Sequence, residues 1–192
     1  MSDNQVGTYK LVASPFHLDV RGKLSMGVLG KHLLNCADAY AAERGFDVVE
    51  QGGEHYTWVL SRLAIELEDL PSCHESFGIQ TWVENVYRLF ADRNFVICDK
   101  DEKPIGYVRS VWAMISMETR NPANLLALYG DRITNSICEK ECPIAKPGRI
   151  KVSQQEAVSE YVAKYSDLDI NGHVNSIKYI EHILDIFPLE TY

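Results

Sequence analysis

Three polar side chains that could share one reaction occupy alternate positions near the end of the chain. Asp169, Asn171 and His173 stand in the run DLDINGHVN at residues 167–175. A carboxylate, an amide and an imidazole can together accept a proton, hold a water molecule and polarise a carbonyl group. Alternation places the three on one face if residues 166–171 stay extended as they leave a strand. The set therefore predicts a polar cluster capable of acid–base chemistry.

A helix should begin directly after this cluster. Gly172 permits a tight bend, Asn175 and Ser176 are suitable N-caps, and Pro188 limits continuation of the helix. Between these limits apolar residues recur at helical spacing: Ile177, Ile180, Ile183, Leu184 and Phe187. The polar cluster would then lie beside unpaired N–H groups at the start of a helix, which favour developing negative charge.

The run DLDINGHVNSIKY, from Asp167 to Tyr179, resembles the entry to the central helix of hot-dog-fold thioesterases, and most of all that of acyl-ACP thioesterases. The resemblance continues through HYTWVLSRLAIELEDLP (55–71), GIQTWVE (78–84) and SVWAMISMETR (110–120), so it covers nearly the whole chain. It implies hydrolysis of the thioester of acyl-acyl carrier protein, which releases free fatty acid and ends chain elongation in fatty-acid biosynthesis. It also implies acyl carrier protein as the partner, and neither a cofactor nor a metal ion.

The implied reaction gives each polar residue a role. Asp169 would take a proton from water, Asn171 would hold the water or the thioester, and His173 would polarise water or carbonyl. Backbone N–H groups of residues 172–174, including Gly172 and Val174, would stabilise the oxyanion. Because the motif places no Ser, Cys or Thr as a nucleophile, we expect direct attack by water, with an acyl anhydride on Asp169 as the alternative.

Other interpretations of the same residues stay open. Asp169 and Asn171 could be plain turn residues, Asn175 a cap and His173 a half-buried histidine with its hydrogen bonds satisfied. An acyl-CoA thioesterase is a second candidate function, because small single-unit hot-dog enzymes share a similar motif. A non-catalytic acyl-binding module is the third.

An internal repeat relates the two ends of the chain, because residues numbered 150 apart correspond without a gap. Leu18, Asp19, Val20, Gly22, Leu24 and Ser25 correspond to Leu168, Asp169, Ile170, Gly172, Val174 and Asn175. The repeat predicts two copies of a strand, a tight turn and a long helix. Arg21 and Lys23 take the places of Asn171 and His173. We therefore expect the first unit to bind substrate and the second to carry catalysis.

The fold class follows from the elements of the first half. A helix should run from Ser25 through Arg44, and four runs rich in β-branched and aromatic residues predict strands at 56–67, 77–84, 92–98 and 105–117. The DKDEKP segment at 99–104 suits an antiparallel hairpin. A long helix across one face of a curled antiparallel sheet is an α+β pattern. With the repeat and the resemblance, this predicts a tandem hot-dog fold.

These elements divide the chain into three parts. Residues 1–120 would form the first hot-dog unit, 121–153 a connection with a short apolar patch at 125–129, and 154–192 the start of the second unit, opened by a strand at 157–165. The chain stops directly after the second helix, so the second unit is expected to be truncated. An acyl pocket should lie between helix and sheet of the first unit, with these candidate lining residues: Leu29, Leu33, Trp58, Trp82 and Trp112.

Composition limits the partners and the compartment. The chain of 192 residues is 46% hydrophobic and 24% charged, as in an ordinary globular protein, and its net charge of −8 disfavours nucleic acid and anionic membranes. No stretch reads as a signal peptide or membrane span, so a cytoplasmic location is expected, with the five cysteines as free thiols.

Acyl carrier protein is acidic, so docking would need a local basic patch. Five residues are the candidates: Lys146, Arg149, Lys151, Lys164 and Lys178. A solvated linker face is the alternative explanation of these charges. A second chain that completes the second unit, in a homodimer, is also possible.

Overall fold

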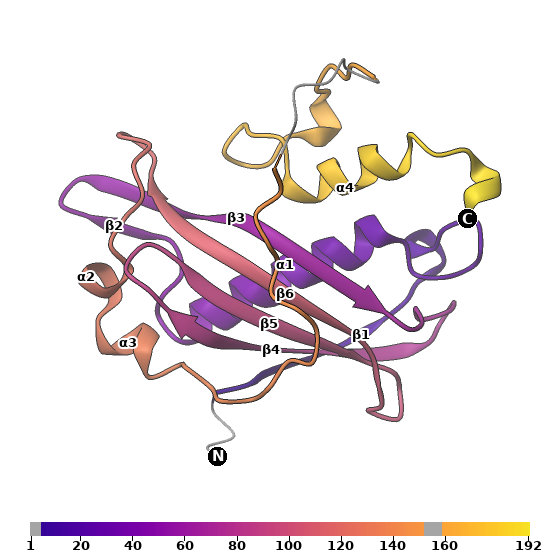
Figure 1. Ribbon diagram of the computed structural model, residues 1–192, viewed down its shortest axis with the longest axis horizontal. Coiled ribbons are helices and arrows are strands. Elements are labelled where there is room, and N and C mark those ends of the chain that lie inside the picture. The colour runs from indigo at the N-terminus through magenta and orange to yellow at the C-terminus, as the bar shows by residue number, and fades with distance from the viewer. Residues whose placement is uncertain (1–4, 152–158) are drawn as a thin grey trace.

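A curled antiparallel sheet packed against one long helix, α1 (Met26–Glu43), makes up most of the fold (Figure 1). The computed structural model describes residues 5–151 and 159–192. Six strands are formed in the described residues, in the order β1-β4-β5-β6-β3-β2. Their bounds are β1 Gly7–Val12, β2 Val49–Gln51, β3 Glu54–Leu67, β4 Ser76–Val86, β5 Ala91–Cys98 and β6 Pro104–Ser116. The predicted α+β arrangement is confirmed.

Helix α1 begins and ends where the sequence predicts. The Ser25 hydroxyl accepts the N–H of Val28 at 3.3 Å, and Gly45, with φ at +68°, lies just beyond the last turn. One apolar stripe of the helix is buried: Leu29, Leu33, Cys36, Ala37, Tyr40 and Ala41. Burial of this stripe against the sheet holds α1 in place.

The four predicted strands correspond to β3, β4, β5 and β6. The β5–β6 hairpin is also confirmed, because the Asp99 carboxylate accepts the N–H groups of Asp101 and Lys103 at 2.9 Å and tightens the turn. The repeat predicted a strand before the first turn without giving its bounds, and β1 is that strand, whereas β2 was not predicted. These two short strands lie at the two edges of the sheet, where pairing with a longer neighbour decides their conformation more than their own composition does.

Residues 123–144 of the predicted connection pack onto the first unit. Helices α2 (Leu125–Tyr129) and α3 (Asp131–Thr134) contribute buried residues to the core at one end of the sheet. The chain then crosses the sheet on the side away from α1, where the carbonyls of Lys140 and Cys142 accept hydrogen bonds from Trp82 and Arg109 (Figure 1). This segment therefore covers the outer face of the sheet.

The predicted strand at 157–165 does not form over its described part. Residues 157 and 158 lie outside the described ranges, 159–164 form no regular element, and Tyr165–Asp167 is the short 3-10 helix η2. The buried Asp167 carboxylate accepts the Lys164 N–H at 2.7 Å and the Tyr161 hydroxyl at 2.9 Å. These local hydrogen bonds favour a turn over an extended strand.

The second helix, α4 (Ser176–Leu184), starts at the predicted cap, because Asn175 Oδ1 accepts the Ile177 N–H at 2.9 Å. It ends at Leu184, before the predicted limit, and the short 3-10 helix η3 (Leu189–Thr191) follows Pro188. Helix α4 packs on α1, where a Cβ atom on Gly30 would lie 2.7 Å from a methyl group of Ile177. Among the described residues, no helix combines the length and apolar character needed to cross a bilayer.

Candidate active site

The two copies of the repeat fold into matching turns. A 3-10 helix precedes each turn, namely η1 (Pro15–His17) and η2, and Gly22 and Gly172 share a φ of +74°. In the second turn, Oδ1 of Asp169 accepts the N–H groups of Asn171 at 2.8 Å and His173 at 3.0 Å. The predicted correspondence at a spacing of 150 residues is therefore confirmed in the geometry of the turns.

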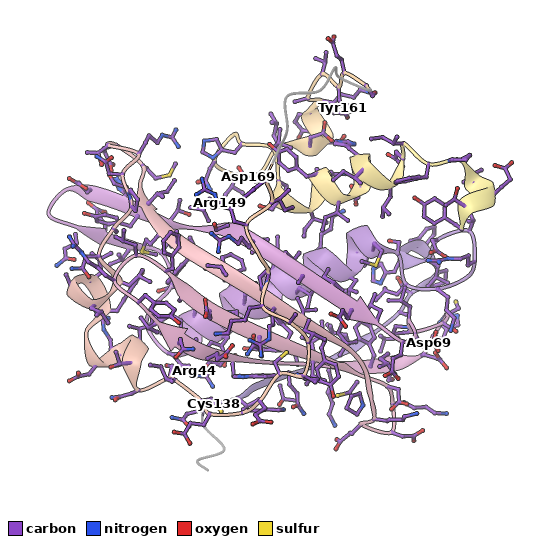
Figure 2. All side chains as sticks on the ribbon, in the orientation of Figure 1. Arg44, Asp69, Cys138, Arg149, Tyr161 and Asp169 are labelled. Atoms are coloured by element: carbon purple, nitrogen blue, oxygen red, sulfur yellow. The ribbon has the colours of Figure 1, made fainter. Side chains whose placement is uncertain are left out.

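The three polar residues reach a common site by a route that differs from the predicted one. Residues 166–171 are not extended, since η2 passes directly into the turn that the Asp169 carboxylate holds. Nevertheless Asp169, Asn171 and His173 all line one cavity. The side chain of Asp169 is half-buried, and those of Asn171 and His173 are exposed. Figure 2 shows Asp169 on the loop that precedes α4.

The cavity, of about 470 Å³, extends from this loop into the space between α1 and the sheet. Trp58 and Trp112 line it as predicted, and Val174 lines it next to the polar cluster, whereas Gly172 only supports the turn. The apolar part of the lining comes mainly from the first unit: Leu34, Ala37, Ala41, Phe46, Val83 and Ala91. A chain bound here would lie within the first unit with its polar end at the second.

Three predicted lining residues lie elsewhere. Leu29 and Leu33 are fully buried in the core between α1 and the sheet, and the cavity instead contacts α1 through the stripe that includes Leu34 and Asp38. Trp82 points to the opposite face of the sheet, where it packs under the segment that follows α3, while its neighbour Val83 lines the cavity. Alternation along β4 accounts for this difference.

Arg120 lies at the site although its residue type and position did not predict this. Its Nη1 atom lies 3.1 Å from Nε2 of His173, and it lines the same cavity. Arg120 follows β6 with φ at +60°, and its own N–H donates to the Ser116 carbonyl at 2.9 Å. The only sequence signal for it was its place at the end of the SVWAMISMETR run.

The carboxylate of the first turn, that of Asp19, already accepts hydrogen bonds from neighbouring residues. Arg21 folds back onto Asp19 with two hydrogen bonds, at 2.5 and 3.0 Å, and Lys23 pairs with Asp69 at 2.9 Å. Burial raises the pKa of Asp19, but the hydrogen bonds from Arg21 outweigh burial, so the pKa of this carboxyl is lowered overall. In contrast, Oδ2 of Asp169 has no hydrogen bond to any described residue. Asp169 thus keeps an oxygen available for a water proton.

Two of the three predicted oxyanion donors are already bonded. The Gly172 N–H donates to the Asp169 carbonyl at 3.0 Å, and the His173 N–H donates to Oδ1 of Asp169. Only the Val174 N–H of these three has no partner in residues 5–151 and 159–192, whereas the corresponding Leu24 N–H donates to the Pro71 carbonyl at 2.8 Å. Of the three N–H groups predicted to stabilise the oxyanion, the one at Val174 therefore stays available for that role.

The described residues offer no metal centre, since no three His, Cys, Asp or Glu side chains among them are grouped to hold an ion. All five cysteines are free thiols, and Cys73 is the exposed one. The arrangement is a carboxylate, an amide and an imidazole at the edge of a mainly apolar cavity. It can orient water against a carbonyl group whose acyl chain occupies the cavity.

Two models of the same protein family match successive parts of this chain. The family model described as "Acyl-ACP thioesterase N-terminal domain" matches residues 9–130, and that described as "Acyl-ACP thioesterase C-terminal domain" matches residues 150–192. A palmitoyl-acyl carrier protein thioesterase of Gossypium hirsutum is 25% identical over 81% of this chain and 39% of its own length. Oleoyl-acyl carrier protein thioesterase 2 of Arabidopsis thaliana is 29% identical over 71% of this chain and 40% of its own length.

Solved structures show the same likeness. An acyl-ACP thioesterase from Bacteroides thetaiotaomicron superposes with a TM-score of 0.89 at 61% identity, covering 99% of this chain and 77% of that one. A 12:0-ACP thioesterase from Umbellularia californica superposes with a TM-score of 0.76 at 17% identity, covering 96% of this chain and 71% of that one. The predicted hot-dog fold is confirmed. The chain spans about 40% of the length of the plant relatives named above.

Proposed function

The chain belongs to the acyl-ACP thioesterase family, and on this premise we propose that it hydrolyses the thioester of acyl-acyl carrier protein. The reaction releases free fatty acid and so ends chain elongation in fatty-acid biosynthesis. One observation carries the proposal: Asp169, Asn171 and His173 of the second unit line the same cavity as apolar residues of the first. A substrate with its thioester at the polar edge and its acyl group inside the cavity fits this arrangement of polar and apolar residues.

The geometry supports attack by water without a covalent intermediate. Oδ1 of Asp169 holds the turn, so Oδ2 would accept the water proton, while the Asn171 amide holds the water in place. The Arg120 guanidinium can only donate, so it would bind the lone pair on Nε2 of His173 and leave the imidazole proton on Nδ1. That proton would polarise the thioester carbonyl, aided by the Val174 N–H.

The same site would also serve an acyl-CoA thioesterase or a non-catalytic acyl-binding module. Thiol release from acyl-ACP and acyl-CoA with identical acyl groups separates the three. We expect a higher kcat/KM on acyl-ACP. A higher kcat/KM on acyl-CoA would favour the second function, and tight binding of acyl groups without thiol release from either substrate would favour the third.

Docking of the acidic carrier protein would use those of the five basic candidates that do not already form ion pairs. Two of the five candidates are already engaged, since Lys146 pairs with Glu84 and Asp92, and Lys178 pairs with Glu181. We therefore place the docking charge on Arg149, Lys151 and Lys164. Reversing these three charges to Glu should raise KM for acyl-ACP and leave KM for acyl-CoA nearly unchanged.

A cytoplasmic location and a homodimer remain parts of the proposal. The free thiols suit a reducing compartment. Exposed apolar residues on and after α4, among them Tyr179, Ile183 and Phe187, support cover by further protein, which a second chain would supply. The mass of the purified protein in solution tests the dimer.

A further inference from the structure

A buried cation lies in the otherwise mainly apolar wall of the cavity. Arg93, on β5, is only 6% exposed and lines the cavity opposite α1. Its guanidinium lies 4.5 Å from the ring centroid of Tyr40, and its Nη1 atom donates to the Thr81 hydroxyl at 3.3 Å. Burying an arginine in a site that accepts alkyl chains costs free energy unless a polar or charged partner compensates.

The described residues do not complete the hydrogen bonding of Arg93. The guanidinium has five N–H donors, and the Thr81 hydroxyl is its one acceptor within the described part of the chain, where it also forms no ion pair. Its other nitrogens are not sealed from solvent, in contrast to Nε of Arg109, which is both sealed and unpartnered. Since Arg93 lines the cavity, an acyl chain bound there would come next to its side chain.

Arg93 stays charged in this setting. Burial lowers its pKa to about 10, still well above neutral pH. A second guanidinium, that of Arg44, lies 3.7 Å from the centroid of the same Tyr40 ring, and it pairs with Glu43 at 3.1 Å. The ring therefore contacts two cations, of which only Arg93 belongs to the cavity wall. A ligand oxygen would give Arg93 the acceptor that the described residues do not supply.

We propose that the cavity takes acyl chains that carry an oxygen acceptor, namely a hydroxyl, oxo or carboxylate group, bound by Arg93. This inference rests on the proposed function and names its substrate class. Hydrogen bonds to a charged group in a water-poor site are stronger than those between neutral groups. Arg93 would therefore discriminate between an oxygen-bearing chain and a plain alkyl chain.

The position of Arg93 places this acceptor away from the thioester. Arg93 pairs with Ser110 on β6, whereas the Arg120 N–H binds the carbonyl of Ser116, six positions further along. At about 3.3 Å per residue this is roughly 20 Å of strand, which the two long side chains only partly bridge. The acceptor therefore belongs several carbons from the carbonyl that meets His173, toward the far end of the chain.

The test uses acyl-ACP substrates of one chain length in four forms: plain, hydroxylated at the β-carbon, hydroxylated at the far end, and ending in a carboxylate. We expect the ratio of kcat/KM for the two far-end forms to that for the plain form to fall about tenfold in Arg93→Met. The β-hydroxy form should show no such change. Arg44→Met is the matched control, because it removes the other cation on Tyr40 without changing the cavity wall, and it should keep the wild-type ratios.

Equal ratios in wild type and Arg93→Met would overturn the proposal, and so would a fall confined to the β-hydroxy form. If Arg93→Met does not fold, Arg93→Lys replaces it, since it keeps a cation and loses the planar donor fork. A wild-type preference for the plain chain over both far-end forms overturns the proposal without any variant.

A binding measurement separates this inference from the proposed function. Trp58 and Trp112 line the cavity, so their fluorescence reports its occupation by free fatty acids without any hydrolysis. Tighter binding of far-end oxygenated acids, lost in Arg93→Met, would support the inference even if no thioester were hydrolysed. Hydrolysis of all four substrates at equal rates would instead leave the thioesterase proposal standing and reject the role of Arg93.

Discussion

Nη1 of Arg120 lies 3.1 Å from Nε2 of His173, and the two residues come from different units of the repeat. Arginine has donors and no acceptor, so this contact requires a lone pair on Nε2 and a proton on Nδ1. The positive φ of Arg120 and its N–H bond to Ser116 direct the loop toward the second unit. A hydrogen bond from the first unit would thus favour one tautomer of the imidazole that the second unit carries.

We therefore predict that Arg120 positions His173 for the reaction. Arg120→Met should lower kcat about tenfold, because it removes the donor to Nε2 and releases the imidazole to either tautomer. Arg120→Gln keeps a donor and should recover part of the loss. Nitrogen chemical shifts of His173, which distinguish the two tautomers, should show a mixture in Arg120→Met and mainly the Nδ1–H form in wild type. A purely structural role for Arg120 would leave those shifts unchanged.

The matching turns of the repeat allow a paired test of catalytic asymmetry. Asp169→Asn keeps a carbonyl oxygen for the N–H groups of Asn171 and His173 but removes the base, so kcat should fall by roughly 10²-fold or more. Asp19→Asn makes the same change in the first turn, where the carboxylate is bound to Arg21. It should alter stability or affinity and leave kcat nearly unchanged. Equal loss of kcat in the two variants would contradict the assignment.

The local parts of the structure were predictable from sequence because local rules fix them. Ser25 and Asn175 cap their helices as expected, and Gly22 and Gly172 adopt the same backbone conformation in both turns. The predicted strand before the second turn does not form over its described part because the Asp167 carboxylate accepts a hydrogen bond from the nearby Lys164 N–H. The strand-like composition did not reveal this contact. Hydrogen bonds between side chains and nearby backbone groups thus explain both the helix caps that were predicted correctly and the predicted strand that did not form.

The residues that line the cavity were less predictable than its place between α1 and the sheet. Leu33 and Leu34 are adjacent on α1, but one packs in the core and the other lines the cavity, and the choice depends on the angle at which the helix crosses the sheet. Arg93 and Arg120 read from sequence as ordinary surface charges. Only the register of β5 and the loop after β6 bring them to the site.

Residues that line the cavity should control acyl chain length. Ala41→Leu fills space in the cavity and should move the preferred substrate to shorter chains, since each excluded methylene costs about 1–3 kcal/mol of transition-state binding. Ala42→Leu makes the same change on the exposed side of α1 and should keep the wild-type preference. The kcat/KM values for a series of saturated acyl-ACP substrates measure the effect.

A core residue should behave differently from a cavity residue. Leu29→Ala removes a fully buried side chain that does not line the cavity, so it should destabilise the fold by about 2–5 kcal/mol. Its kcat/KM should then fall by a similar factor for every chain length. A changed chain-length preference in Leu29→Ala, with no change in Ala41→Leu, would indicate that the acyl chain binds on the core side of α1 instead of in the cavity.

The last prediction is that water attacks the thioester directly. None of the five cysteines is among the described residues that line the cavity, and burial raises the pKa of Cys36 to about 12, so no activated thiol accompanies Asp169. Alkylation of the exposed Cys73 should therefore leave most of the activity. In a single turnover in ¹⁸O-labelled water, the label should enter the released fatty acid and be absent from Asp169.

An acyl anhydride on Asp169 would give a different distribution of label. Opening at the aspartyl carbonyl would place ¹⁸O in Asp169, whereas opening at the acyl carbonyl would label the fatty acid, as direct attack does. Hydroxylamine adds a second test for the anhydride, because its attack on the aspartyl carbonyl would leave Asp169 as a hydroxamate, whereas an enzyme that uses water directly keeps Asp169 unmodified. Oδ1 of Asp169 is bound to two N–H groups of its own turn, so nucleophilic attack would fall to Oδ2, the oxygen assigned as the base. Label in Asp169, or a trapped adduct there, would show that this oxygen attacks the carbonyl carbon instead of taking a proton from water.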